Sequence, residues 1–350
     1  MTAVHQLLPT AAPHDAVTEQ AFRWRDLLQG WGHEGEIVAE HVHPDLLERV
    51  RRMDRSGRRL LREGRVILRY ALWSATVKTA LESDTRVALC YHNITPGPLL
   101  REFNPEVAAL CDRGRDGLTV FRGKIDALIA DSSFNALDLR EAGLGDATVI
   151  PLLLDLPTEV PRRRPNRDPV VLTVGRLAPN KRLEDVVKSF ALYQRHRAPR
   201  ASLLVIGSDR GFESYRRALE DLIARVGARR VFFTGPISSA ARDAWYRYAD
   251  VYLSMSVHEG FCAPLIESLA HGLPVVARAA GAVPETVGGA GLVLEGGDPA
   301  VVAEALHAAA SSQSTRDALL DAADARLSEL RPDVLAPRIR SALAPLLEEA

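Results

Sequence analysis

Two glutamates lie in the segment HEGFCAPLIESLAHGLPVVA, residues 258–277. Glu259 stands in its polar first part, and Glu267 lies in an apolar stretch with the spacing of a helix. Proline favours the first turn of a helix, so Pro264 indicates a helix that begins near Cys262. We therefore expect Glu259 in the loop before this helix and Glu267 in its first turn or just beyond.

The position of these acids has two interpretations. A carboxylate near the amino terminus of a helix can cap it, because free N–H groups and the helix dipole attract negative charge there. Alternatively, both acids could accept hydrogen bonds from the hydroxyls of a ligand, while Gly260 lets the backbone approach that ligand closely. From the residues alone, both interpretations stay open.

Basic residues follow an earlier apolar run. Gly175 ends the run PVVLTV, and Arg176 and Lys181 follow it. They could be two solvated charges at the start of a helix, although positive charge is mildly unfavourable there. Alternatively, they could bind the oxygens of a phosphate on a ligand, where negative charge grows if a bond to that phosphate breaks. Arg176 would supply a planar fork and Lys181 a compact ammonium.

The second half of the chain alternates short apolar runs with stretches of helical spacing, which predicts βαβ units and a parallel sheet covered on both faces. The expected strands are 169–174, 201–206, 231–233, 250–254 and 274–277, and the expected helices are 181–196, 213–226, 239–247 and 263–271. The first half shows the same alternation, with a helix at 15–31 and strands at 4–8, 36–39, 66–70, 87–91, 127–130 and 148–150.

A stretch rich in proline and arginine separates the halves, as a surface linker does. We expect an N-terminal Rossmann-like domain (1–155), a linker (156–168), a C-terminal Rossmann-like domain (169–332) and a helix that could cross back to the first domain (333–350). The expected fold class is therefore α/β, with two doubly wound domains that face a cleft.

The composition excludes several classes of protein. The net charge of −1 gives no case for nucleic-acid binding, which needs a basic surplus. No apolar run is long enough to span a bilayer, and the N-terminus lacks a signal-peptide pattern, so we expect a cytoplasmic protein. The three cysteines are far apart and indicate reduced thiols. The Gly175 loop is not GxGxxG, which disfavours a dinucleotide-dependent oxidoreductase, and no P-loop motif occurs. His258-Glu259 is not part of an HExxH motif, because Cys262 stands in the place of the second histidine.

The segment from Glu259 to Val276 closely resembles the Glu-x7-Glu signature of the retaining family 4 glycosyltransferases (glycosyl transferases group 1), which have the GT-B fold. The segment 174–182 is similar to the donor diphosphate loop of that family, and 234–236 resembles its nucleobase loop. The resemblance covers roughly residues 165–300 closely and the first half more loosely.

The resemblance implies that the first domain binds the acceptor and the second the nucleotide sugar, and it implies a role for each matching residue. Glu267 would bind the ribose of the donor, and Glu259, Gly260, Phe261 and Cys262 would face the transferred sugar. Gly175, Arg176 and Lys181 would hold the diphosphate, and Gly235 and Pro236 the nucleobase. His92 follows an apolar run, where a lone histidine is usually structural; by resemblance we favour a sugar contact. The implied catalytic residues are Glu259, His92, Arg176 and Lys181.

The first half departs from the family. A glycine-rich turn is common there after the first strand, but this chain has LPTAAPHD, and His14 or Asp15 could serve the acceptor instead. The arginine-rich stretch 49–65 could touch an anionic membrane or a lipid-linked acceptor, although such a run is more often a solvated helix face. Membrane contact is therefore open but not favoured.

The sequence as a whole indicates a retaining glycosyltransferase that moves a sugar from a nucleoside diphosphate donor, with uridine or guanosine, to an acceptor hydroxyl. The acceptor could be a small molecule, a lipid-linked compound or a saccharide. The basic pair and the lack of Asp-x-Asp favour an enzyme with no metal and no cofactor. The alternatives are a non-catalytic module that binds sugar nucleotides and a sugar-nucleotide epimerase of the same fold.

Overall fold

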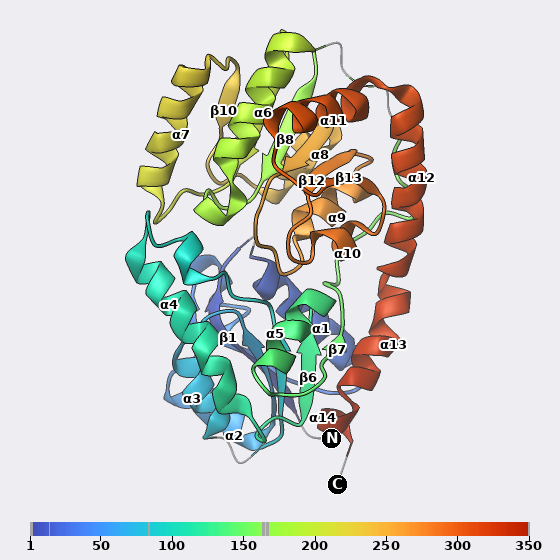
Figure 1. The fold of residues 1–350 in the computed structure, drawn as a ribbon. Coiled ribbons are helices and arrows are strands. Elements are labelled where there is room, and N and C mark those ends of the chain that lie inside the picture. Colours follow the sequence, from blue (N-terminus) through green and yellow to red (C-terminus); the bar gives the residue numbers. More distant parts are fainter. Residues whose placement is uncertain (1–2, 14, 83–84, 163–164, 166–167, 349–350) are drawn as a thin grey trace. The chain divides into compact units, whose positions relative to one another are not determined.

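The structure is a computed structural model that describes residues 3–13, 15–82, 85–162, 165 and 168–348. The chain divides into two compact units (Figure 1). The first contains residues 1–97, 109–154 and 330–350, and the second contains residues 98–108 and 155–329.

The first unit is built on a seven-stranded sheet in the order β3-β2-β1-β4-β5-β6-β7, in which every neighbouring pair is parallel. The strands are β1 (Val4–Ala11), β2 (Ile37–Val42), β3 (Arg51–Arg52), β4 (Arg65–Tyr70), β5 (Val87–Tyr91), β6 (Ala127–Ala130) and β7 (Thr148–Val149). Strand order runs outward in both directions from β1 and β4, which makes their junction the switch point of a doubly wound sheet.

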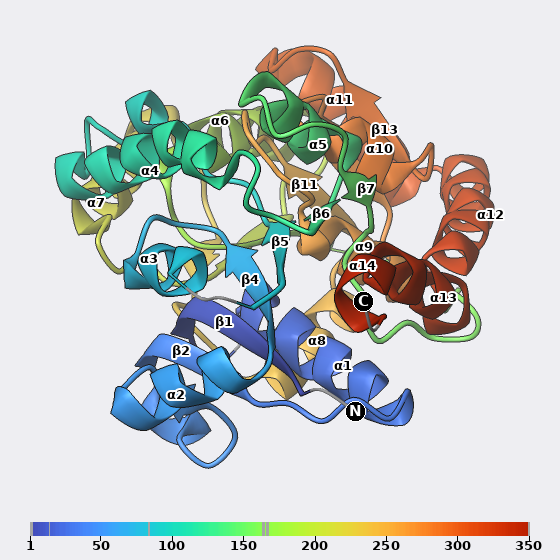
Figure 2. The same cartoon turned by 90° about the horizontal axis from the view of Figure 1, so that it is seen from below.

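The helices of the N-terminal part are α1 (Ala16–Gly30), α2 (Arg55–Glu63), α3 (Ala75–Leu81), α4 (Pro105–Asp116) and α5 (Ser133–Glu141), and the C-terminal ones are α13 (Pro332–Ala342) and α14 (Ala344–Leu347). Side chains of α1, α13 and α14 share one hydrophobic cluster with β4, β5 and β6. Helices α2 and α3 contact the sheet as well, and Figure 2 shows them on the side opposite to α1. The last helices of the chain therefore complete the core of the first unit.

The second unit has a six-stranded sheet in the order β10-β9-β8-β11-β12-β13, again with parallel neighbours throughout. The strands are β8 (Val170–Val174), β9 (Ser202–Ile206), β10 (Val231–Phe233), β11 (Val251–Ser254), β12 (Val275–Arg278) and β13 (Gly291–Leu294). The helices are α6 (Leu183–His196), α7 (Glu213–Val226), α8 (Ser239–Tyr248), α9 (Ala263–Ala270), α10 (Val283–Val287), α11 (Pro299–Ser311) and α12 (Gln313–Glu329). Its switch point lies between β8 and β11.

Two parallel sheets of this winding confirm the predicted fold class, but several predicted boundaries were wrong. β1 continues past Leu8 to Ala11. Beyond Leu7 this strand pairs with β2 alone, so Pro9, which lacks an N–H, removes no hydrogen bond to β4. The helix predicted from Lys181 begins at Leu183 instead, after a 3₁₀ turn. Strand β13 was not predicted at all.

The arginine-rich stretch 49–65 folds into β3 and α2, whose buried residues are Gly57 and Leu61. Arg51 pairs with Glu36, and Arg59 pairs with Glu63. Both pairs are solvent-exposed, so they contribute little to stability. None of the helices in the described part of the chain is both long and apolar enough to cross a bilayer.

The core position of α13 leads to a test of stability. Ile339 of this helix is fully buried in the cluster that also holds Trp24. We expect Ile339→Ala to lower the free energy of unfolding by about 2–5 kcal/mol, because it leaves a cavity in a packed core. Val334 lies on the same helix and is 40% exposed, so Val334→Ala should change the stability by less than about 0.5 kcal/mol. Guanidinium unfolding followed by tryptophan fluorescence measures both; equal losses in the two variants would contradict this packing.

Candidate functional site

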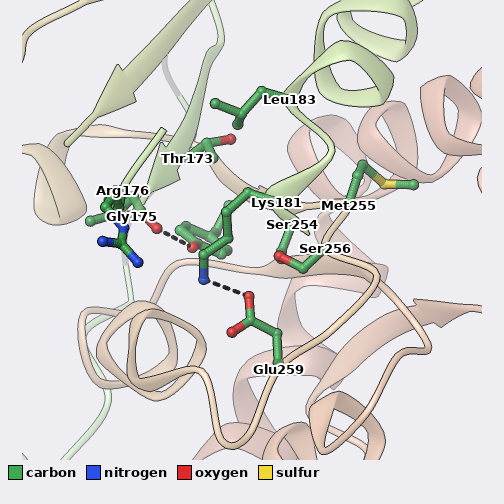
Figure 3. A pocket seen from close by; sticks show the side chains of 11 residues that line it. Thr173, Gly175, Arg176, Lys181, Leu183, Ser254, Met255, Ser256 and Glu259 are labelled. Carbon is green, nitrogen blue, oxygen red and sulfur yellow. Dashed lines mark hydrogen bonds and ion pairs between the residues drawn. The ribbon is translucent and has the colours of Figure 1, made fainter. Parts of the chain in front are cut away.

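A small pocket of about 10 Å³ lies where strands β8 and β11 end, at the switch point of the second sheet. Open parallel sheets bind ligands at this position, because the loops that follow the strands diverge there. Figure 3 shows side chains from both loops pointing toward one another. The lining residues are Thr173, Val174, Gly175, Arg176, Lys181, Leu183, Tyr252, Ser254, Met255, Ser256 and Glu259.

An ion pair joins the two loops across the pocket. Lys181 Nζ lies 2.6 Å from Glu259 Oε1, and the side chains are 22% and 9% exposed. Burial lowers the pKa of Lys181, but Glu259 and the nearby Cys262 more than offset this and leave the pKa raised, against a smaller opposing effect of Arg176. Lys181 is therefore an ammonium at neutral pH, held by a mostly buried carboxylate.

Backbone contacts fix the loop that carries Glu259. The Asn180 carbonyl accepts a hydrogen bond from Val257 N at 2.9 Å, and the Asn180 side-chain amide donates to the His258 carbonyl at 3.4 Å. Gly281 packs against this loop in the left-handed region (φ 55°), and a Cβ there would lie 2.4 Å from the Glu259 carbonyl oxygen. The loop position therefore depends on residues before α6 and after β12 that touch it through the main chain.

The diphosphate-loop candidates Gly175 and Arg176 follow β8 directly. Gly175 has a φ of 148°, which only glycine adopts without strain, and its N–H donates to the Ile206 carbonyl at 2.9 Å. Arg176 is exposed, and its guanidinium lies 5.7 Å from the centre of the Phe212 ring. The structure thus brings one exposed and one partly buried cation to the same pocket.

Glu267 lies deeper in α9 than a capping residue does. It is the fifth residue of the helix, and its carboxylate accepts a hydrogen bond from the Tyr246 hydroxyl to Oε2 at 2.8 Å. Its other oxygen, Oε1, lies 3.4 Å from Arg242 Nη2. Capping therefore does not explain Glu267, because its carboxylate oxygens contact side chains of α8 rather than the free N–H groups at the start of α9.

Tyr252 connects Glu267 to the pocket. Its hydroxyl donates to the Val174 carbonyl at 3.1 Å, and its ring centre lies 6.3 Å from that of Tyr246. Burial raises the pKa of Tyr252 well above its ordinary value, and Cys262, Glu259 and Glu267 add to the effect. Both glutamates thus act on one tyrosine of the pocket wall, although Glu267 is not itself a lining residue.

The other predicted donor residues lie next to the pocket in sequence rather than in its lining. Phe261 and Cys262 are buried at the start of α9, where Cys262 takes a left-handed conformation with φ 69°. Gly260 stands between them and Glu259. Gly235 and Pro236 follow the edge strand β10, and the Gly235 carbonyl accepts a hydrogen bond from Gly207 N at 3.2 Å. Their contact with the nucleobase therefore stays a prediction.

His92 lies in the first unit, at the carboxyl end of β5. Its Nδ1 is 2.8 Å from Asp131 Oδ2, its Nε2 is 3.3 Å from Arg69 Nη1, and its side chain is 3% exposed. Burial lowers the pKa of His92, but Asp131 and Cys90 raise it to about 10. The hydrogen-bond geometry argues against a raised pKa of His92, because a protonated Nε2 would point its N–H at the Nη1 donor of Arg69. We favour the neutral ring, in which Nδ1–H donates to Asp131 and Nε2 accepts from Arg69.

Arg69 is the fully buried cation beneath His92. It donates to the Gln6 side-chain oxygen at 2.8 Å and lies 4.7 Å from the Trp24 ring. Cys90, His92 and Asp131 form a group that could reach one metal ion, but Arg69 Nη1 lies 4.0 Å from Cys90 Sγ and 3.3 Å from the His92 ring. A fixed positive charge between two of the three ligand atoms disfavours a cation here.

Sequence reasoning missed three residues that support the candidates: Arg69, Arg242 and Tyr246. Arg242 and Tyr246 are four residues apart on a predicted helix, so they share one face, but nothing in that spacing indicates which carboxylate they reach. Arg69 interrupts the apolar run VILRY. A charge inside a predicted buried strand is a signal of a polar network beneath a site.

Comparisons with known proteins show which proteins the second half of the chain resembles. Residues 168–312 match the family model of the glycosyl transferases group 1. A D-inositol 3-phosphate glycosyltransferase of Corynebacterium efficiens is 32% identical over 169 residues, covering 46% of this chain and 40% of that protein. The enzyme of the same name from Xylanimonas cellulosilytica is 31% identical over 227 residues, or 59% and 53% of the two chains.

The fold has solved counterparts. Anabaena Alr3699/HepE, in a crystal structure in complex with UDP and glucose, superimposes with a TM-score of 0.78 over 99% of this chain and 100% of that one, at 16% identity. This likeness to the Anabaena protein concerns the fold alone. The chain spans about half the length of the curated relatives that it matches. The segment 168–312, which contains the Lys181–Glu259 pair and Glu267, is the part of the chain that matches the glycosyl transferases group 1 family.

Proposed function

We propose that this protein is a retaining glycosyltransferase that moves a sugar from a nucleoside diphosphate donor to an acceptor hydroxyl. The observation that carries the proposal is the convergence of Arg176, Lys181 and Glu259 at the switch point of the second sheet. Two cations and a carboxylate on an otherwise small, partly apolar pocket suit a ligand that has both phosphates and hydroxyls. The family match over the same residues supports this interpretation.

Lys181 would stabilise the leaving diphosphate. Charge accumulates on the phosphate oxygens as the bond to the sugar breaks, and a preorganised cation lowers the energy of that state. The pair with Glu259 already holds Lys181 Nζ at the pocket, so little reorganisation is needed. When phosphate oxygens approach Lys181, the Glu259 carboxylate becomes free to accept hydrogen bonds from sugar hydroxyls.

Retention of configuration fits the same arrangement. In the proposed step, the bond between the anomeric carbon and the diphosphate oxygen breaks, and the acceptor oxygen bonds to that carbon on the same face. The departing phosphate takes the acceptor proton, so no side chain needs to act as a nucleophile. Glu259 would orient the sugar during this step.

The donor and acceptor classes follow from chemistry and from the relatives. The Anabaena protein binds UDP and glucose, which makes UDP and UDP-glucose the first donors to test here, with their guanosine counterparts beside them. The acceptor could be a small molecule, a lipid-linked compound or a saccharide. His92 would contact the sugar only after giving up a bond to Asp131 or Arg69, because both ring nitrogens are engaged.

Two other functions give different results in one assay. A non-catalytic module would bind the donor without transfer or hydrolysis, and an epimerase would convert the donor without any acceptor. Incubation with UDP-glucose, followed by chromatography of the sugars and nucleotides, separates the three. Slow release of glucose and UDP, which are the products of transfer to water, supports the transferase.

Donor binding should need no metal ion, because Arg176 and Lys181 supply the positive charge that a metal would otherwise bring. UDP or GDP at ~100 times its dissociation constant should raise the stability of the fold by ~2.7 kcal/mol. Thermal shift in the presence and absence of EDTA measures this. A shift that appears only with added Mg²⁺ or Mn²⁺ would refute metal independence, and no shift with any nucleotide would refute the proposed function.

Removal of the Lys181 ammonium should lower kcat. We expect Lys181→Ala to lose on the order of 10²–10³ in kcat, as for the loss of one preorganised donor, and Lys181→Arg to recover only part of it. The variant also leaves the Glu259 carboxylate unpaired, so the double variant Lys181→Ala/Glu259→Gln is measured as well.

The control for this test is Lys188→Ala, on the exposed part of α6. Lys188 is 43% exposed and its ammonium lies 3.9 Å from the nearest carboxylate oxygen, of Asp185, so kcat and melting temperature should stay near those of the wild type. A folded Lys181→Ala protein with near-normal kcat would exclude the phosphate role. If the activity of Lys181→Ala returned in the double variant, the loss would come from the unpaired carboxylate instead.

The two glutamates should differ in their kinetic effects. Glu267→Gln should mainly raise the donor KM if Glu267 holds ribose equally in the ground and transition states, and Glu259→Gln should mainly lower kcat if Glu259 orients the reacting sugar. Both substitutions keep the size of the side chain. Steady-state kinetics with varied donor tests this division, and matching profiles for the two variants would disprove it.

A further inference from the structure

The carboxylate of Glu267 is held by two residues of α8 that no motif contains. Tyr246 reaches Oε2 at 2.8 Å, and Arg242 lies 3.4 Å from Oε1. These residues are four apart on α8, so they project from the same face of the helix. Each oxygen of the carboxylate therefore has one fixed partner.

Tyr246 belongs to the buried core of the second unit. Its side chain is fully buried, and its ring stacks on His271 with centres 5.3 Å apart and planes 15° from parallel. His271 in turn lies 2.8 Å, through Nδ1, from the Glu267 carbonyl. The phenol is therefore fixed against the same turn of helix that carries Glu267.

The remaining hydrogen-bonding capacity of Glu267 faces elsewhere. A carboxylate has about four lone-pair positions; the Tyr246 hydroxyl uses one on Oε2, and Arg242 forms an ion pair with Oε1. The Glu267 side chain is 22% exposed, so the other positions can be reached from outside the protein core. Two adjacent hydroxyls, such as the 2′ and 3′ hydroxyls of a ribose, match two oxygens that each have a lone pair free.

From this geometry, and resting on the proposed function, we propose that Tyr246 and Arg242 are positioning residues that fix the Glu267 carboxylate for the recognition of a ribose diol in the donor. Without them Glu267 could still reach a hydroxyl, but its carboxylate would sample several rotamers. The entropy lost on binding would then rise, and the preference for a ribose over a deoxyribose would fall.

Tyr246→Phe removes the hydroxyl and keeps the stacked ring. The experiment measures dissociation constants of UDP, 2′-deoxy-UDP and 3′-deoxy-UDP by calorimetry for the wild type and for this variant, with the GDP series in place of UDP if GDP binds more tightly. We expect the wild type to bind the ribose form at least about tenfold more tightly than a deoxy form, since a hydrogen bond to a charged group has that value. In Tyr246→Phe this ratio should fall to about threefold or less.

A purely structural role would give another result. If Tyr246 only stabilised the contact between α8 and α9, Tyr246→Phe would weaken all three ligands alike and leave the ratio unchanged, which would overturn the proposal. Tyr248→Phe is the matched control, because Tyr248 lies on the same helix and is 53% exposed; its ratio should equal that of the wild type.

A second variant keeps the proposal testable if Tyr246→Phe does not fold. Arg242 is 25% exposed, so Arg242→Gln should be tolerated, and it should lower the same ratio by releasing the other oxygen. Equal binding of the ribose and deoxy forms by the wild type would overturn the role of Glu267 and this inference while leaving nucleotide binding intact. The binding of no nucleotide at all would refute the proposed function itself.

Discussion

In both sheets every strand runs parallel to its neighbours, so each loop that follows a strand leaves from the same edge of its sheet. This constraint gathers side chains that are far apart in the sequence. The β8 loop brings Lys181 and the β11 loop brings Glu259, 78 residues further on, to one point. In the first unit, the ends of β4, β5 and β6 bring Arg69, His92 and Asp131 into one network.

The buried charges of the two networks are compensated in different ways. Lys181 and Glu259 neutralise each other directly, and both line a pocket, so a ligand can replace either partner. Arg69 and Asp131 are separated by the His92 ring, which bonds to both. Removal of one partner of the second network would leave an uncompensated charge in the core. We interpret this network as the support that holds the β5 loop in place.

The winding of the sheets and the positions of the site loops could be predicted from the sequence, because apolar runs that end in glycine are local signals. The predicted role of Glu267 as a possible helix cap could not be decided, since the competing partners Tyr246 and Arg242 lie on another helix. The start of α6 was also predicted wrongly. Charged and apolar residues alternate through Lys181, but Arg182 takes a left-handed conformation with φ 49° and separates a 3₁₀ turn from the helix.

The different partners of the two glutamates give a physical reason for different roles. Glu259 is paired with the Lys181 ammonium. Under the proposed function, the diphosphate of the donor would compete for this ammonium, weaken the pair and free the carboxylate next to the reacting sugar. Glu267 accepts a hydrogen bond from a buried phenol and forms an ion pair with a guanidinium, both on α8, and neither residue lines the pocket around Lys181. Under the proposed function, partners outside that lining suit a group that would bind the unreactive part of the donor with equal strength before and during the transfer.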